Sequence, residues 1–229
     1  MVTGYERTIM KDLKKAYILN ICIVVLEVFA VSWMMSGIKA GVLSAAKLSS
    51  LKYFTVDSNI LMGIFALLAA LDQGKVLKGK KAEVSVLTYI LKLSGTVGVT
   101  LTMLVTIFFL GPTMGRTYGF FSLFEKSNFF LHLFNPVLSI IVFLCFEKSL
   151  KITFKHTFTA VIPLVIYSIY YVAVTVAHMT NGVINKGYDW YGFFVLGIRS
   201  AFIVLPAIII ITWLISFALW KLNRRNLNG

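Results

Sequence analysis

Charged residues divide this sequence into six apolar segments, and this spacing constrains its fold more than any other feature. Each segment has about 20 residues, the length of helix that crosses a hydrocarbon layer about 30 Å thick. Because 59% of the residues are hydrophobic and 14% are charged, a soluble core could not bury the apolar surface. We predict an all-α polytopic membrane protein, a six-transmembrane-helix bundle that forms a single domain over residues 1–229. The spans are expected at about Ile18–Ile38, Phe54–Leu71, Val86–Leu110, Phe129–Phe146, Thr157–Ala177 and Gly192–Trp220.

The distribution of lysine and arginine predicts the orientation of the bundle, because short cytoplasmic loops carry an excess of both. The N-terminal segment, the second and fourth connections and the C-terminal tail together contain 14 basic residues. The other three connections contain 6. We therefore expect both termini on the cytoplasmic side of the cell membrane, an N-in/C-in topology.

Two other interpretations of the basic residues are less favoured. A cleaved signal peptide would also place a basic start before an apolar stretch, but Ile18–Ile38 is longer than the roughly 7–15 residue core of a signal. The net charge of +13 could suggest nucleic acid, but these residues flank spans and form no nucleic-acid-binding domain. We expect no nucleic acid partner and assign the charge to topology and to anionic lipid headgroups.

Polar side chains inside spans are costly, so they are the first candidates for function. Most of them lie toward the expected outer ends of their helices. Arg199 is expected about 10 Å into the sixth span, at roughly 1.5 Å per residue. Glu27 lies near the middle of the first span and needs a partner, whereas Lys92 lies near the cytoplasmic end of the third span, where it can snorkel. The outer set comprises Thr55, Asp57, Ser58, Asn59, His132, Asn135, Tyr171, His178 and Arg199.

Thr55 has two interpretations. It is either a helix cap at the start of the second span or a nucleophile, which needs a general base because a hydroxyl is weak at neutral pH. His132 is the candidate base, although a single histidine in a span is more often a hydrogen-bond donor between helices. Its position about one turn into the fourth span, with Asn135 on the same face, favours catalysis. The catalytic interpretation requires the two side chains to lie within a direct or water-mediated hydrogen bond.

A metal site is the neighbouring alternative. His132, His178, Asp57 and Glu27 are all ligand types. No HExxH motif or closely spaced histidine pair is present. We expect no metal and no other cofactor, and the sequence leaves open whether a metal bridges His132 and His178.

Three motifs together resemble a known family. They are Tyr53–Leu61, Leu131–Pro136 and Tyr188–Tyr191. In order and spacing they resemble bacterial members of the androgen-induced protein family, which includes the androgen-dependent regulator of tissue factor pathway inhibitor. Tyr191-Gly192 stands where that family usually has Tyr-Pro.

The resemblance implies an intramembrane threonine hydrolase of fatty acyl esters, such as fatty acid esters of hydroxy fatty acids. It places the nucleophile at Thr55 and the base at His132. In such a reaction the base removes the hydroxyl proton, the oxygen attacks the ester carbonyl, and water or another alcohol releases the acyl group. Similar multi-span proteins transfer acyl chains between lipids, so a lipid acyltransferase remains an alternative.

The other candidates have supporting roles in this hypothesis. The partners are a lipid or fatty acyl ester substrate and the membrane lipids. Ser58, Asn59 or Asn135 would polarise the carbonyl, His178 or Arg199 would bind a carboxylate or headgroup, and Phe54, Phe134 and Trp190 would line an acyl channel. Asp57, Glu27 and Tyr171 are possible supporting residues.

A non-enzymatic carrier or channel for a small anion or proton is the alternative from a different class. Its pathway would use Glu27, His132, His178 and Arg199. The polar residues gather toward one side of the membrane, which favours an enclosed site over a pathway. The substrate, its chain length and the oligomeric state are not indicated by the sequence, and a structural or regulatory subunit is neither supported nor excluded.

Overall fold

The computed structural model describes residues 4–45, 47–194 and 196–225, and within these ranges the chain forms helices and no strands. Six of its helical segments are long and apolar enough to cross a membrane. The expected all-α polytopic bundle is confirmed, and the chain is a multi-pass membrane protein. The spans run over Ile9–Ser36, Phe54–Leu77, Val86–Tyr118, Ser127–Phe146, Lys155–Ala177 and Ile198–Arg225.

Several spans are built from more than one helical element. The α-helices are α1 (Gly4–Ser36), α2 (Phe54–Leu77), α3 (Val86–Val105), α4 (Gly111–Tyr118), α5 (Ser127–Phe129), α6 (Asn135–Ile141), α7 (Lys155–Thr159), α8 (Ile162–Ala177) and α9 (Ile198–Arg225). Three π-helical turns lie between them: η2 (Thr106–Leu110), η4 (Phe130–Phe134) and η5 (Val142–Phe146). Two 3₁₀ turns, η1 (Lys47–Lys52) and η3 (Phe121–Phe124), lie in connections.

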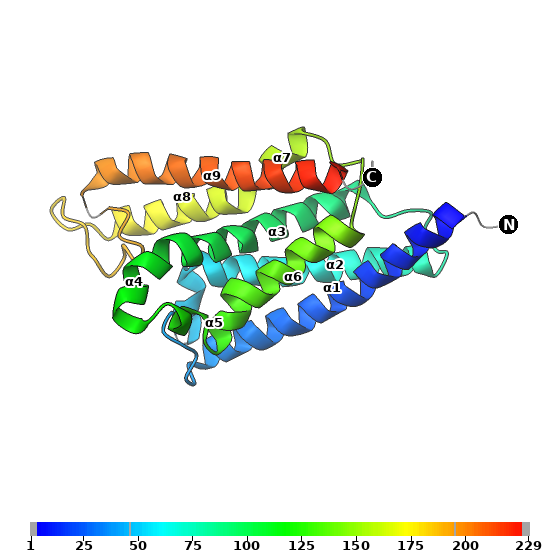
Figure 1. Ribbon diagram of the computed structural model, residues 1–229. Coiled ribbons are helices and arrows are strands. Elements are labelled where there is room, and N and C mark those ends of the chain that lie inside the picture. Colours follow the sequence, from blue (N-terminus) through cyan, green and yellow to red (C-terminus); the bar gives the residue numbers. More distant parts are fainter. Residues whose placement is uncertain (1–3, 46, 195, 226–229) are drawn as a thin grey trace.

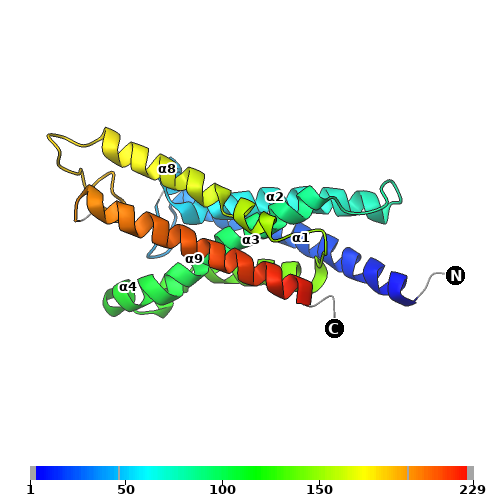
Figure 2. The same ribbon diagram turned by 90° about the horizontal axis from the view of Figure 1, so that it is seen from above.

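Helix α3 occupies the centre of the bundle. It packs against α2 and α6 on one side and against α8 and α9 on the other, while α1 packs against α2 and α6 (Figure 1). The start of α1 and the end of α9 lie at the same end of the bundle (Figures 1 and 2). We call this the terminus end, and the opposite end the far end.

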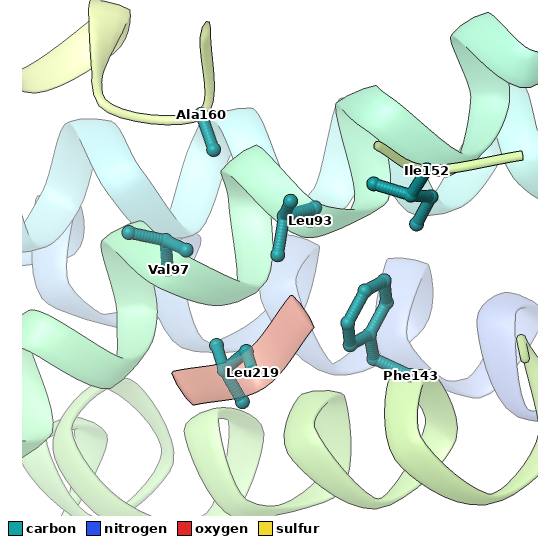
Figure 3. Close-up of a cluster of buried hydrophobic side chains, with 6 residues drawn as sticks. All are labelled: Leu93, Val97, Phe143, Ile152, Ala160 and Leu219. Atoms are coloured by element: carbon teal, nitrogen blue, oxygen red, sulfur yellow. The ribbon is translucent and has the colours of Figure 1, made fainter. Parts of the chain in front are cut away.

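Small and apolar residues let α3 make these contacts. A Cβ atom at Gly95 would lie 2.9 Å from the Met62 sulfur, so α2 approaches closely there because Gly95 has no side chain. On the opposite face, Leu93 and Val97 pack with apolar residues of η5, α9 and the segment around α7 (Figure 3). These contacts join the two halves of the bundle.

Several expected boundaries differ from the structure, since the first span already begins at Ile9 and the second continues to Leu77. The third span continues beyond Leu110 through α4, since Pro112 stands near the start of a helix, where its missing N–H costs little. The fifth span breaks after Thr159, just before Pro163, and the Ala160 carbonyl at the break accepts a hydrogen bond from Ser94 Oγ at 3.1 Å.

The sixth helix begins at Ile198, not at Gly192. Gly192 and Gly197 have φ angles of +70° and +82°, which suit glycine and do not continue an α-helix. Arg199 therefore lies in the first turn of α9, exposed at the far end of the bundle. The expected depth of Arg199 in the membrane is wrong.

Candidate functional site

The first turn of α2 is held by aromatic side chains from elsewhere in the chain. Tyr53 has extended backbone angles and is the residue that precedes the helix, so Thr55 lies inside the first turn and the cap interpretation of Thr55 is wrong. The backbone N–H of Phe54 donates to the Tyr191 hydroxyl at 2.8 Å. Tyr167 donates to the Lys52 carbonyl at 2.5 Å. Burial raises the pKa of Tyr191 well above its ordinary value, so its hydroxyl keeps its proton.

Thr55 is partly exposed, and its hydroxyl has no hydrogen-bond partner in the described part of the chain. This is unusual for a hydroxyl in a membrane helix, which ordinarily bonds to a carbonyl one turn earlier, as Thr100, Thr106 and Thr175 do here. The Thr55 backbone N–H is likewise unpaired within the described residues, as expected in a first helical turn. Thr55 therefore offers an unbonded hydroxyl beside an unbonded N–H.

Asn59 connects this turn to the fourth span. Its side-chain nitrogen donates to the Thr55 carbonyl at 2.7 Å and to the Leu131 carbonyl at 3.2 Å. The two carbonyl oxygens therefore lie within about 6 Å of each other. His132 follows Leu131 directly, so the first turn of α2 faces the backbone that carries His132.

His132 is buried in the π-helical turn η4, a type of turn that often occurs at functional sites. Its Nδ1 atom lies 3.2 Å from the Asn128 carbonyl oxygen. Because a carbonyl can only accept, Nδ1 carries the proton and Nε2 has the free lone pair. No hydrogen bond joins the His132 ring directly to the Thr55 hydroxyl in the described structure.

Two clefts flank this site. Side chains of α2 and α8 line a cleft of about 490 Å³, with Phe54 and Asp57 on one wall and Tyr167 and Tyr170 on the other. Thr55 does not line it. A second cleft, of about 420 Å³, lies near the far end among Phe120, Phe121, Phe124, Phe129, Ile107 and Leu133.

Three other candidates near Thr55 have distinct surroundings. Ser58 is buried, and its hydroxyl donates to the Thr55 carbonyl at 3.0 Å. Asn135 is fully buried, and neither of its amide atoms is hydrogen-bonded. Asp57 contributes a carboxylate to the apolar cleft beside α8.

His178 and Phe134 make ring contacts with other residues. His178 is exposed and its ring stacks on Tyr188, with 3.6 Å between the ring centroids. Phe134 is exposed, stacks on Phe129 and lines neither cleft. Within the described residues, no group of three His, Cys, Asp or Glu side chains is arranged to hold a metal.

Tyr171 and Trp190 belong to an aromatic cluster that packs the segment before α9 against α8. The Tyr171 hydroxyl donates to the Asp189 carboxylate. The indole N–H of Trp190 donates to the Tyr167 hydroxyl at 3.0 Å. Trp190 thus helps to hold the residue that supports the start of α2.

A buried polar network occupies the terminus end, where the sequence indicated none. Lys92 is fully buried, so the expectation that it snorkels is wrong. Its ammonium nitrogen donates to Asn20 Oδ1 at 2.7 Å and lies 3.6 Å from Glu147 Oε2. Asn20 and Gln73 both donate to Glu147 Oε1, at 2.6 and 2.9 Å, and Asn20 also donates to Gln73 Oε1 at 3.1 Å. Four helical segments meet in this network, and the polar residues Asn20 and Gln73 within apolar helices were the signal that pointed to it.

Glu27 lies between this network and His132. It is 2% exposed, and neither carboxylate oxygen has a hydrogen bond of ordinary geometry. Asn135 faces the carboxylate and Lys92 acts on it through its charge, whereas Arg199 is exposed at the far end. Buried polar groups therefore extend along the bundle and are not confined to one end.

No family model, curated protein or solved structure matches this chain.

Proposed function

We propose that this protein is an intramembrane carboxylic ester hydrolase that cleaves fatty acyl esters, with Thr55 as nucleophile and His132 as general base. One observation carries the proposal. Thr55 has an unbonded hydroxyl and N–H, and Asn59 holds its helical turn against the backbone of His132. The resemblance of the three sequence motifs to the androgen-induced protein family supports the same pair of residues.

The bonding of His132 suits the role of base. With Nδ1 donating to the Asn128 carbonyl, Nε2 accepts the Thr55 proton as the hydroxyl oxygen attacks the ester carbonyl. The negative charge that forms on the carbonyl oxygen lies near the Thr55 N–H and the positive end of α2. His132 then returns the proton to the departing alcohol, which leaves an acyl group on Thr55.

Water completes hydrolysis by the reverse sequence. His132 takes a proton from the water, the hydroxide attacks the acyl-threonine ester, and the carboxylic acid leaves while Thr55 regains its proton. If the hydroxyl group of a second lipid replaces the water, the product is a new ester. The same pair of residues then acts as an acyltransferase.

The cleft between α2 and α8 supports a lipid substrate. Its volume of about 490 Å³ is in the range of small-molecule sites, and its walls are mostly aromatic and aliphatic. An acyl chain there would lie against Phe54, the residue before Thr55. With the termini in the cytoplasm, the far end and Thr55 would face the outer leaflet.

Turnover by reconstituted protein tests the proposal. Thr55→Ala and His132→Ala should each lower hydrolysis of a fluorogenic long-chain acyl ester by roughly 10²–10⁴-fold, because a nucleophile and its base act as a unit. Thr55→Ser should keep part of the activity, since it keeps the hydroxyl. A fluorophosphonate should label Thr55 in the wild type and not in Thr55→Ala, as peptide mass spectrometry would report.

Thr117→Ala is the matched control, because Thr117 is an exposed threonine at the far end of α4. It should hydrolyse the ester at the wild-type rate. Each variant must also elute as the wild type does in size-exclusion chromatography. Equal turnover by the wild type and Thr55→Ala would reject the mechanism.

A carrier of protons or small ions is a second candidate. The buried polar groups that continue from His132 through Glu27 to Lys92 favour it. In liposomes, a carrier would give a proton or ion flux that falls in Glu27→Gln and is unchanged in Thr55→Ala. A hydrolase would instead give an ester turnover that falls in Thr55→Ala and is unchanged in Glu27→Gln.

A further inference from the structure

A layer of unpaired polar atoms lies in the middle of the bundle, between the Thr55 site and the Lys92 network. The side chains of this layer come from α1, α3 and α6. The unbonded atoms are both carboxylate oxygens of Glu27, the Thr96 hydroxyl, the Ser139 hydroxyl, and the amide oxygen and nitrogen of Asn135. Glu27 is 2% exposed and the other three residues are fully buried.

Contacts between helices bring together the elements that carry these side chains in the middle of the bundle. Asn135 faces the Glu27 carboxylate, and Ser139 lies one turn later on the same face of α6. Gly63 of α2 borders Glu27, since a Cβ atom at Gly63 would lie 3.2 Å from the Glu27 Cβ. The preceding residue on α2, Met62, contacts Gly95, which precedes Thr96 on α3.

An apolar cluster borders the layer. Ile23, Val99 and Val142 are buried together with Met62 and Ala66. Ile23 lies one turn before Glu27, Val99 one turn after Thr96, and Val142 one turn after Ser139. The polar layer is thus enclosed by the packed interior of α1, α2, α3 and α6.

The buried charges do not balance. Apart from His132, the buried acidic and basic side chains of the described residues are Glu27, Lys92 and Glu147. Lys92 and Glu147 form an ion pair at 3.6 Å, which leaves the negative charge of Glu27 without a partner. A buried carboxylate is strongly disfavoured unless a positive charge and hydrogen bonds compensate it. An ionised Glu27 would therefore need a positive charge within this layer.

We propose that the layer binds one monovalent cation, with Na⁺ as its first candidate, through the oxygen atoms of Glu27, Thr96, Asn135 and Ser139. Carboxylate, amide and hydroxyl oxygens are the ligands that hard cations prefer. The single uncompensated charge favours a monovalent ion over Mg²⁺ or Ca²⁺. This cation site does not depend on the proposed hydrolase activity.

A proton on Glu27 is the competing occupant. It would neutralise the carboxylate and supply one hydrogen bond. The two hydroxyl groups and one of the Asn135 amide atoms would still lack partners. A cation of suitable size coordinates several oxygen atoms at once, so it accounts for more of the unpaired atoms than a proton does.

Cation-dependent thermal unfolding tests the site. Purified protein in a neutral detergent, at constant pH and ionic strength, is melted in NaCl, KCl, LiCl and N-methylglucamine chloride. The wild type should show a Tm that rises by several degrees with Na⁺ concentration relative to N-methylglucamine, because only the folded protein binds the ion. Binding of radioactive ²²Na⁺ to the same sample should saturate near one ion per chain.

Two kinds of variant separate the site from general salt effects. Glu27→Gln keeps the shape of the side chain and removes its charge, so the Na⁺-dependent rise and ²²Na⁺ binding should both be lost. Ser139→Ala and Thr96→Val remove one ligand each and should shift the response to higher Na⁺ concentration by roughly 10-fold, about the effect of one hydrogen bond to a charged group. Glu125→Gln, at an exposed carboxylate, should behave as the wild type.

The proposal fails if the wild type shows no cation-specific response, or if Glu27→Gln responds as the wild type does. It also fails if Tm depends only on pH and ²²Na⁺ does not bind, because a proton then occupies Glu27. If Glu27→Gln does not fold, the ligand variants decide: an unchanged Na⁺ response in both Ser139→Ala and Thr96→Val would overturn the site. Loss of ester turnover in Thr55→Ala bears on the hydrolase alone.

Discussion

The Asn128 carbonyl determines the state of the His132 ring. Because the carbonyl accepts from Nδ1 at 3.2 Å, the ring presents Nε2 as an acceptor. Asn59 and Ser58 both donate to the Thr55 carbonyl, which fixes the first turn of α2. Local hydrogen bonds thus hold the two elements that carry the proposed base and nucleophile.

Substitution of Lys92 tests how much the buried ion pair with Glu147 contributes to stability. Lys92→Met should lower the free energy of unfolding by roughly 3–5 kcal/mol, because it leaves Glu147 buried without its cation. The double variant Lys92→Met/Glu147→Leu should recover most of this loss. Reversible unfolding in mixed detergent micelles, followed by circular dichroism, measures both changes. A double variant less stable than Lys92→Met would show that the ion pair is not the source of the effect.

The helices of this bundle are interrupted, and neighbouring elements bond the groups that each interruption leaves free. Ser94 of α3 donates to the Ala160 carbonyl where the fifth span breaks. At the end of η5, Asn223 of α9 donates to the carbonyls of Phe143 and Glu147, at 2.6 and 3.1 Å. Its side-chain oxygen also accepts from the Ser149 N–H at 3.0 Å. Terminal carbonyls need such partners because no water reaches them in the hydrocarbon region.

Asn223→Leu should therefore loosen α9 from the fourth span. The expected loss in the free energy of unfolding is roughly 1–3 kcal/mol, the cost of buried backbone groups left unpaired. Leu222→Ala, at an exposed neighbouring residue, should change stability much less. Thermal unfolding of both variants in detergent measures the difference. An equal loss in the two would assign the effect to general disturbance of α9.

Across the whole molecule, six spans place the start of α1 and the end of α9 at one end. The basic residues gather at that end, so we predict that it faces the cytoplasm. The site around Thr55 and the clefts near the far end would then open to the outer leaflet. The Lys92 network would lie nearer the cytoplasm.

Cysteine labelling in intact cells checks this orientation. In a background with Cys22 and Cys145 replaced by serine, an impermeant maleimide should label cysteines at Lys47, Thr117 and Lys186 from outside. Cysteines at Lys78, Lys151 and Arg225 should react only after the cells are permeabilised. The opposite pattern would invert the topology, and a mixed pattern would contradict the six-span bundle.

Much of this architecture follows from the sequence alone. Hydropathy determines the number of spans, since a backbone in hydrocarbon must form helices to pair its polar groups. The positions of Thr55 and His132 near the same ends of the second and fourth spans also follow, because alternate spans cross the membrane in the same direction. The distances between side chains do not follow, because they depend on how each helix is rotated about its axis.

Tertiary structure alone decided the rest, because burial and pairing depend on which helix faces overlap. Lys92 could reach the membrane surface from an isolated helix, but its place on the central helix α3 encloses it beside Asn20 and Glu147. The cap of α2 and the start of α9 depend on local backbone angles that hydropathy does not encode. The unpaired layer around Glu27 exists only where α1, α3 and α6 meet, because these three helices are far apart in the sequence and come together by packing.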